Sequence, residues 1–306
     1  MTHIRFIGNS KKYFTFSIIL IAAIIVCTGI MGVQLDIQFK GGSIITYTYD
    51  GALDKDQFGQ IAQDLTDTTI SIQQSTDLAS GMETIVLTLP GSHTLTSEQM
   101  VAVTQGLQEA FPENNPRTIA ISNVDPTIGK EFLIKCLTAV ALASILMVLF
   151  IAWRFKKIGG FSAGVMAVVA LIHDVIIVFG VFIIFRIPLN DNFIAVVLTI
   201  LGYSINDTIV IYDRIRENKR IMGAKASIGE LVETSINQSF RRSLNTTITT
   251  MISMIVVTVV AMIYGVESII SFSLPMLLGL ISGAYSSICI AGPLWVKWQE
   301  RKPGKK

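Results

Sequence analysis

The sequence predicts an integral membrane protein with six transmembrane helices and one small α+β domain outside the membrane. Hydrophobic residues make up 51% of its 306 residues and charged residues only 15%, whereas a soluble domain carries about 25% charge. Six apolar runs are long enough to cross a bilayer, and one hydrophilic stretch of about a hundred residues follows the first of them. Basic residues gather in alternate connections between the runs, as they do in membrane proteins of fixed orientation.

The six runs each approach or exceed the roughly 20 residues that a helix needs to span the hydrocarbon core. We expect transmembrane helices at residues 13–33, 132–153, 158–185, 192–212, 243–266 and 268–296. Lysine and arginine cluster in the N-terminal segment 1–12, in the short connection before the third helix, in a loop at 213–242 and in the tail 297–306. The positive-inside rule places all four in the cytoplasm, so both termini are expected there.

The stretch 34–131 therefore lies on the outer side, and it holds 13 acidic and only 4 basic residues. Its residue pattern predicts β-α-β-β-α-β, the order of a ferredoxin-like domain with both helices on one face of the sheet. The expected strands are Ile37–Tyr49, Thr69–Gln73, an alternating segment with Ile85, Leu87 and Leu89, and Thr118–Val124, which continues the alternation with Ile119 and Ile121.

The two helices of this domain are predicted from their apolar faces. The first follows Asp54 and presents Phe58, Ile61, Ala62 and Leu65 on one side. The second begins at a capping box formed by Thr96 and Gln99, and buries Met100, Val103, Leu107 and Phe111. The domain has no cysteine and no glycine-rich phosphate loop, and its lone His93 is typical of a solvated loop. It is expected to bind or to move, not to catalyse.

Several functional classes find no support in the sequence. No Gly-x-x-x-x-Gly-Lys-[Ser/Thr] motif occurs, which argues against an ATPase. No nucleophile, histidine and acid can be placed together as in a hydrolase, and no histidine or cysteine spacing indicates a metal site. The charge is divided between two sides of a membrane, so a uniformly basic nucleic-acid surface is also a poor interpretation. We expect neither an enzyme nor a cofactor.

Asp207 is the first candidate for function, because an ionisable residue inside a membrane helix is costly and is functional by default. It lies six residues before Asp213, where the charged loop begins, and thus about 9 Å inside the apolar region. Desolvation favours its neutral form and a nearby cation favours its charged form. A carboxylate held between these two influences can load and release a proton, whereas a permanently paired one is structural.

Arg242 is the expected partner of Asp207, although Arg241 competes for this role. Thr246, Thr249 and Ser253 follow Arg242 at roughly helical spacing, so they form a stripe of hydroxyl groups that can line a hydrated path or bond to neighbouring helices. If that stripe faces the fourth transmembrane helix, Arg242 lies opposite Asp207. Otherwise Arg242 is an anchor at the cytoplasmic boundary.

His173 and Asp174 lie near the middle of the third run. Adjacent residues point about 100° apart on a helix, so the two are not expected on one face. One of them can belong to a proton relay while the other bonds to a neighbouring helix. In the sixth run, Gly279, Gly283 and Ser287 recur every four residues, a pattern of small residues that lets helices approach closely.

Taken together, these residues resemble the SecF family of bacterial protein-export subunits. The most specific match is the segment Gly202-Tyr-Ser-Ile-Asn206-Asp-Thr-Ile-Val-Ile-Tyr-Asp213-Arg-Ile-Arg-Glu-Asn218. It is supported by Phe39-Lys-Gly41-Gly42, Pro126-Thr-Ile-Gly-Lys-Glu131, Ala170-Leu-Ile-His-Asp174 and Arg241-Arg-Ser-Leu-Asn-Thr-Thr247. The resemblance covers almost the whole chain, and the related SecD proteins and larger RND-type transporters share the six-helix plan.

The resemblance implies a definite function and definite partners. SecF proteins pair with SecD in the cytoplasmic membrane, associate with the SecYEG channel and often with YidC, and use the proton-motive force instead of ATP to draw unfolded preproteins outward. The functionally essential aspartate and arginine of that family match Asp207 and Arg242, with the adjacent Arg241 as the alternative for the arginine. The implied cycle protonates Asp207 from outside, weakens its pairing with Arg242 and moves the outer domain. The alternative is a proton-driven RND-type exporter of small molecules or lipids.

Overall fold

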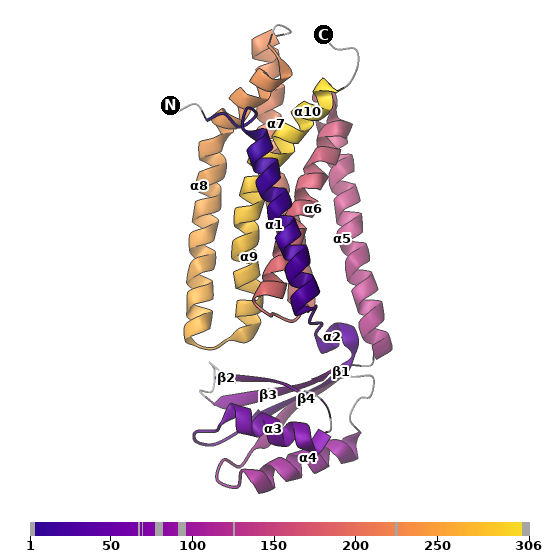
Figure 1. The fold of residues 1–306 in the computed structure, drawn as a ribbon, viewed down its shortest axis with the longest axis vertical. Helices are drawn as coiled ribbons and strands as arrows, with labels where there is room; N and C mark the ends of the chain where they lie inside the picture. Colours follow the sequence, from indigo (N-terminus) through magenta and orange to yellow (C-terminus); the bar gives the residue numbers. More distant parts are fainter. Residues whose placement is uncertain are drawn as a thin grey trace.

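The computed structural model describes residues 4–66, 68, 70–76, 82–90, 96–124, 126–223 and 226–301. It consists of a bundle of long helices with a small α+β domain at one end, and both ends of the chain lie at the opposite end of the bundle (Figure 1). Within the described residues, six helices are long and apolar enough to cross a membrane. The predicted fold class, six membrane helices with a small sheet domain, is therefore confirmed.

The long helices divide into an inner and an outer set. They are α1 (Ser10–Met31), α5 (Pro126–Arg154), α6 (Gly160–Ile184), α7 (Asp191–Met222), α8 (Ile228–Ile263) and α9 (Glu267–Ser286), the last continuing through a π-helical turn, Ser287–Ala291, into α10 (Gly292–Glu300). In their apolar windows α6, α7 and the α9–α10 helix have 56%, 56% and 67% of residues buried. The corresponding shares for α1, α5 and α8 are 11%, 6% and 17%, so these three present most of their surface to lipid.

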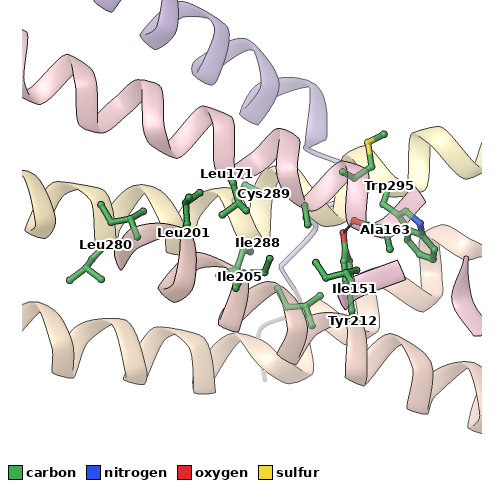
Figure 2. Packing of buried hydrophobic residues seen from close by; sticks show 14 of the residues in the cluster. Ile151, Ala163, Leu171, Leu201, Ile205, Tyr212, Leu280, Ile288, Cys289 and Trp295 are labelled. Atoms are coloured by element: carbon green, nitrogen blue, oxygen red, sulfur yellow. Dashed lines mark hydrogen bonds between the residues drawn. The ribbon is translucent and has the colours of Figure 1, made fainter. Parts of the chain in front are cut away.

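The core of the bundle lies where α6, α7 and α9 meet. Figure 2 shows Leu171, Leu201 and Ile288 among the side chains that fill this space. Nearer the termini, the Tyr212 hydroxyl donates a hydrogen bond of 3.0 Å to the backbone oxygen of Ala163, which satisfies the one polar atom of a fully buried ring. The inner helices are thus fixed against one another, and they carry His173, Asp174 and Asp207.

The predicted loop at 213–242 is mostly helical. α7 continues to Met222 and α8 begins at Ile228, where the Ser227 hydroxyl caps the helix by accepting from the backbone of Glu230. The two extensions are joined side by side, because the Asn218 amide donates to Ser235 Oγ at 2.9 Å and to Gln238 Oε1 at 2.8 Å. Polar contacts between helices replace the apolar contacts of the membrane region here.

The outer domain has the predicted ferredoxin-like topology. Its antiparallel sheet has the order β2-β3-β1-β4, with β1 at Gly42–Thr48, β2 at Ser71–Thr76, β3 at Glu83–Pro90 and β4 at Arg117–Val124. Helices α3 (Lys55–Thr66) and α4 (Ser97–Ala110) cover the face of the sheet that is turned away from the bundle (Figure 1). Tyr47, Phe58 and Leu107 form its fully buried centre, and the capping box of Thr96 and Gln99 is present.

Three details of this domain differ from the prediction. Residues Ile37–Lys40 form a short helix, α2, instead of strand, because Gly41 (φ 84°) and Gly42 (φ 142°) turn the chain before β1 begins. Leu65 is 45% exposed at the end of α3. Ile119 and Ile121 are 57% and 49% exposed, since β4 is an edge strand that the helices do not cover. His93 lies outside the described residues.

Candidate functional site in the helical bundle

The candidate residues fall into two groups within the bundle. Asp207 lies on α7 and is 2% exposed, where it faces α8. His173 and Asp174 lie on α6 and are 6% and 0% exposed; Asp174 faces α7 and α9, and His173 lies against Tyr285 of α9. Burying either carboxylate in hydrocarbon is unfavourable unless its oxygens find partners. The two groups differ sharply in how far that requirement is met.

Asp207 is the carboxylate with unmet hydrogen-bonding capacity. Its Oδ2 atom is buried and has no hydrogen-bond partner among the described residues, and the same is true of the Ser243 hydroxyl on α8. Ser243 acts on Asp207 as a nearby hydroxyl group, although the pair does not reach hydrogen-bond geometry, and Arg242 acts on it through its charge, both across the α7–α8 interface. Arg242 and Asp207 both belong to the described part of the chain, and they form no ion pair within 4.0 Å. The carboxylate is thus influenced by a cation but is not neutralised by contact.

The hydroxyl stripe of Thr246, Thr249 and Ser253 lies on the exposed side of α8. Thr246, Thr249 and Ser253 are exposed, and each donates to the backbone oxygen one turn earlier in α8. In this part of α8 the buried hydroxyl residues are Ser243 and Thr247, which are 1% and 3% exposed. The condition that this stripe faces the fourth transmembrane helix is therefore not met. Ser243, which the sequence analysis did not single out, is the residue that meets Asp207.

The remaining residues of the fourth-helix motif lie away from this site. Asn206 and Gly202 are exposed on the face of α7 that is turned out of the bundle, and a Cβ atom at Gly202 would have no neighbour within 4 Å. Asp213 forms ion pairs with Arg216 at 2.7 Å and Arg154 at 3.5 Å. Gly41 and Gly42 belong to the turn that leads into β1, remote from Asp207 along the chain.

Asp174 is enclosed by hydroxyl groups from two other helices. Ser282 of α9 donates to its Oδ1 at 2.6 Å, while Ser286 of α9 and Ser204 of α7 donate to its Oδ2 at 2.6 Å and 2.9 Å. His173 Nδ1 lies 3.2 Å from Oδ1. These four groups supply the hydrogen bonds that water gives to an ionised carboxylate. Asp174 therefore joins α6, α7 and α9 through one buried side chain.

His173 and Asp174 contact each other, contrary to the expectation that they occupy separate faces. The backbone directions do diverge, but both side chains are buried and they turn toward each other. An ionised carboxylate only accepts hydrogen bonds, so the tautomer with the proton on Nδ1 is the one that lets His173 donate to it in this contact. His173 Nε2 is then left with a lone pair, and it has no partner within the described part of the chain.

The small residues of α9 bring these hydroxyl groups into place. A Cβ atom at Gly283 would lie 3.1 Å from Cβ of Ser204, and one at Gly279 would collide with Ile200. The predicted close approach of helices therefore occurs against α7. Just beyond it the helix widens into the π-helical turn Ser287–Ala291, a feature often found at functional sites.

Ser287 extends the polar cluster along the α7–α9 interface. Its hydroxyl donates to the backbone oxygen of Ser204 at 2.9 Å and accepts from Thr208 Oγ1 at 3.0 Å. Thr208 is the neighbour of Asp207 in the chain, so the two carboxylate sites are separated by one line of buried hydroxyl groups. No group of three or more histidine, cysteine or acidic side chains suited to a metal ion occurs among the residues described.

Comparison with protein families gives a direct result. The family described as "Protein export membrane protein SecD/SecF, C-terminal" matches residues 103–301, which include α5 to α10 and every candidate residue of the bundle. The matched region also includes the end of the outer domain with β4.

Individual relatives cover the whole chain. The protein translocase subunit SecF of Alicyclobacillus acidocaldarius is 32% identical over 98% of this chain and 94% of its own length. The protein translocase subunit SecF of Petrotoga mobilis is 33% identical over 99% of this chain and 98% of its own. The SecDF protein of Bacillus subtilis is 32% identical, but this chain spans only 38% of its length.

The fold also matches a solved structure. The crystal structure of SecDF, a translocon-associated membrane protein from Thermus thermophilus, superimposes with a TM-score of 0.80 at 28% sequence identity. The superposition covers 98% of this chain and 39% of that longer chain.

These matches define a multi-pass membrane protein of the protein-export class, and its described residues include six helices long enough to span a membrane and one small sheet domain. Within that class, the chain belongs to the SecF family of protein translocase subunits.

Proposed function

We propose that this chain works with a SecD partner and uses the proton-motive force to draw unfolded preproteins outward through the SecYEG channel. The observation that carries this proposal is the buried Asp207 carboxylate with an unpartnered oxygen, placed between α7 and α8 within the field of Arg242. A carboxylate with an open hydrogen-bonding position can accept a proton without first breaking a buried hydrogen bond. Its charge then changes at the interface between two long helices.

The size of the driving force constrains this mechanism. Moving one elementary charge across the membrane is worth about 2.3 kcal/mol per 100 mV. Switching a two-state equilibrium from 1:99 to 99:1 requires about 5.5 kcal/mol. A cycle at ordinary potentials therefore uses more than one proton per stroke or shifts the population of states only in part. Neutralising Asp207 removes its attraction to Arg242, so that α8 is free to repack against α7.

The proposed pairing with SecD is supported by an exposed polar face of the bundle. α7 turns Ala195, Thr199, Gly202 and Asn206 outward, and α8 turns its hydroxyl stripe outward. Small residues and hydroxyl groups at membrane depth are typical of contacts between helices, because lipid offers polar groups no partner. The SecDF relatives, of which this chain matches 38–39%, are long enough to contain a second bundle in the same polypeptide.

The setting of the protein follows from this proposal. The chain is a multi-pass protein of the bacterial cytoplasmic membrane, with both termini in the cytoplasm and the sheet domain outside. YidC is a further proposed partner beside SecYEG. The protein acts as a transport subunit and not as an enzyme, and its energy source is the proton gradient without a bound cofactor.

The test compares Asp207→Asn with Asp213→Asn in inverted membrane vesicles that carry SecD and SecYEG. Asparagine keeps the shape of the side chain and removes its titration. Asp207→Asn is expected to lose the part of late translocation that an uncoupler abolishes, while Asp213→Asn, which alters only the half-buried ion pairs with Arg216 and Arg154, retains it. Uncoupler-sensitive translocation at the wild-type level in Asp207→Asn would show that this residue does not carry the proton.

A further inference from the structure

A second feature of the bundle is a cavity on the lipid-facing side of α6, away from Asp207. It has a volume of about 360 Å³ and lies between α1, α6 and α9. Its lining is apolar except for His173, Ser282 and Tyr285, and the Tyr285 hydroxyl group is already bonded to Ser17 Oγ and to the backbone oxygen of Tyr13. Several lining side chains, among them Phe16, Ile184 and Ile281, are between 44% and 56% exposed, so the cavity opens toward the bilayer.

His173 gives this apolar cavity one specific polar group. The side chain is 6% exposed, and its Nε2 atom is buried without a hydrogen-bond partner in the described chain. Asp174 fixes the ring from the other side through Nδ1, as a carboxylate commonly orients the imidazole of a binding or catalytic histidine. With the proton on Nδ1, a neutral ring offers Nε2 as a hydrogen-bond acceptor. The cavity therefore suits a hydrogen-bond donor.

The position of His173 excludes an ordinary phospholipid as the ligand that satisfies it. His173 lies midway along α6, and the cavity extends from there to Phe185, next to the helix end nearer the sheet domain. Twelve residues of helix correspond to about 18 Å. A phospholipid with its headgroup at the outer surface would place a terminal methyl group beside His173. Such a group cannot donate a hydrogen bond, so the donor must belong to a molecule that is apolar along most of its length.

We propose that this cavity binds a chain-like lipophilic alcohol, with its hydroxyl group donating to His173 Nε2 and its apolar chain lying against α1, α6 and α9. The volume lies within the range of small-molecule sites, which is roughly 300–1,000 Å³. Gly180 contributes the space for this approach, since it allows Ile24 of α1 to lie directly against α6 at the cavity wall. This site is separate from the proposed proton site and does not depend on it.

The experiment uses the purified full-length protein in nanodiscs and two photoactivatable probes, a diazirine-bearing hexadecanol and its methyl ether. The two probes differ only in the O–H donor. Labelling of the cavity is measured by mass spectrometry of peptides from α1, α6 and α9. The alcohol is expected to label about three- to tenfold more than the ether, the gain given by one net hydrogen bond. His173→Phe keeps an aromatic ring and should reduce this ratio to about one.

Two further variants separate the cavity from the histidine. Ile177 lines the cavity, and Ile177→Trp fills it without removing the His173–Asp174 contact, so labelling by both probes should be lost. Leu198→Trp adds the same bulk on the exposed face of α7 and should leave labelling unchanged. Equal labelling of the wild type by alcohol and ether would overturn the proposal. So would an alcohol preference that survives in His173→Phe, or labelling that survives in Ile177→Trp. If His173→Phe fails to fold, the wild-type ratio and Ile177→Trp still decide.

Discussion

Asp174 and Asp207 are buried carboxylates in the same bundle, and their surroundings are opposite. Asp174 accepts from three serine hydroxyl groups and lies against His173, so both of its oxygens are occupied. Among the described residues, Asp207 has an oxygen without a hydrogen-bond partner and faces the Ser243 hydroxyl group, which also has none. A carboxylate whose hydrogen bonds are complete holds helices together, and changing its charge would break several contacts at once. A carboxylate whose hydrogen bonds are incomplete changes charge with little local cost.

This comparison assigns a structural role to Asp174 and a functional role to Asp207, although sequence alone ranks both as candidates for one relay. Burial does not distinguish them, because both are at most 2% exposed. The number of donors directed at each carboxylate does. The comparison can be tested by mutations that affect stability at one site and activity at the other.

The largest expected effect on stability is that of Asp174→Ala. The change removes the common acceptor of Ser204, Ser282 and Ser286, and leaves three buried hydroxyl groups to find others. Hydrogen bonds between membrane helices average about 0.6 kcal/mol each, with a maximum near 1.7, so the loss should be on the order of 2–3 kcal/mol. Reversible unfolding in mixed micelles measures it. A loss below about 0.5 kcal/mol would mean that Asp174 does not hold the helices together.

A smaller effect is expected from the serines, and here the two sites provide matched variants. Ser286→Ala removes one donor to Asp174 and should cost about 1 kcal/mol. Ser243→Ala removes a hydroxyl group that has no partner among the described residues and should change stability by less than about 0.5 kcal/mol. The same unfolding assay compares them. Equal losses would show that Ser243 is bonded to Asp207 as firmly as Ser286 is to Asp174.

A still smaller change in stability is expected from Asp207→Asn. The amide replaces a carboxylate whose desolvation is only partly compensated, so stability should stay within about 0.5 kcal/mol of the wild type. Asp174→Asn is the matched control and should be clearly less stable than the wild type. In the wild type the serine hydroxyl groups donate to both carboxylate oxygens, and in the variant one of these oxygens is replaced by an amide nitrogen that cannot accept. If Asp207→Asn were the less stable of the two, the assignment of roles would be reversed.

The fold was largely predictable because its signals are local. Apolar length identified the six helices, and strand alternation with a capping box identified the order of the outer domain. The Asp174 site was not predictable, because Ser204, Ser282 and Ser286 are small residues distant from Asp174 in sequence. They meet only because α9 approaches α7 at Gly283. On α8, hydroxyl residues occur on two faces, and sequence could not decide which one turns inward. In the structure, Ser243 and Thr247 lie on the face that is buried.

Arg242 should give the smallest change in stability and the clearest test of coupling to Asp207. The residue is exposed and makes no ion pair with Asp207 within 4.0 Å, so Arg242→Lys should leave the unfolding free energy nearly unchanged. An anchor at the membrane boundary needs only a positive charge, and lysine would then preserve translocation. A partner that acts on Asp207 needs the planar, permanently charged guanidinium group. We therefore expect uncoupler-sensitive translocation to fall in Arg242→Lys and to be lost in Arg242→Ala, while Arg241→Ala stays close to the wild type.

Combining Asp207→Asn with Arg242→Ala should be no worse than either change alone, because residues that act as a unit are non-additive. Defects that multiply, or a stronger defect at Arg241, would contradict the coupling of Arg242 to Asp207.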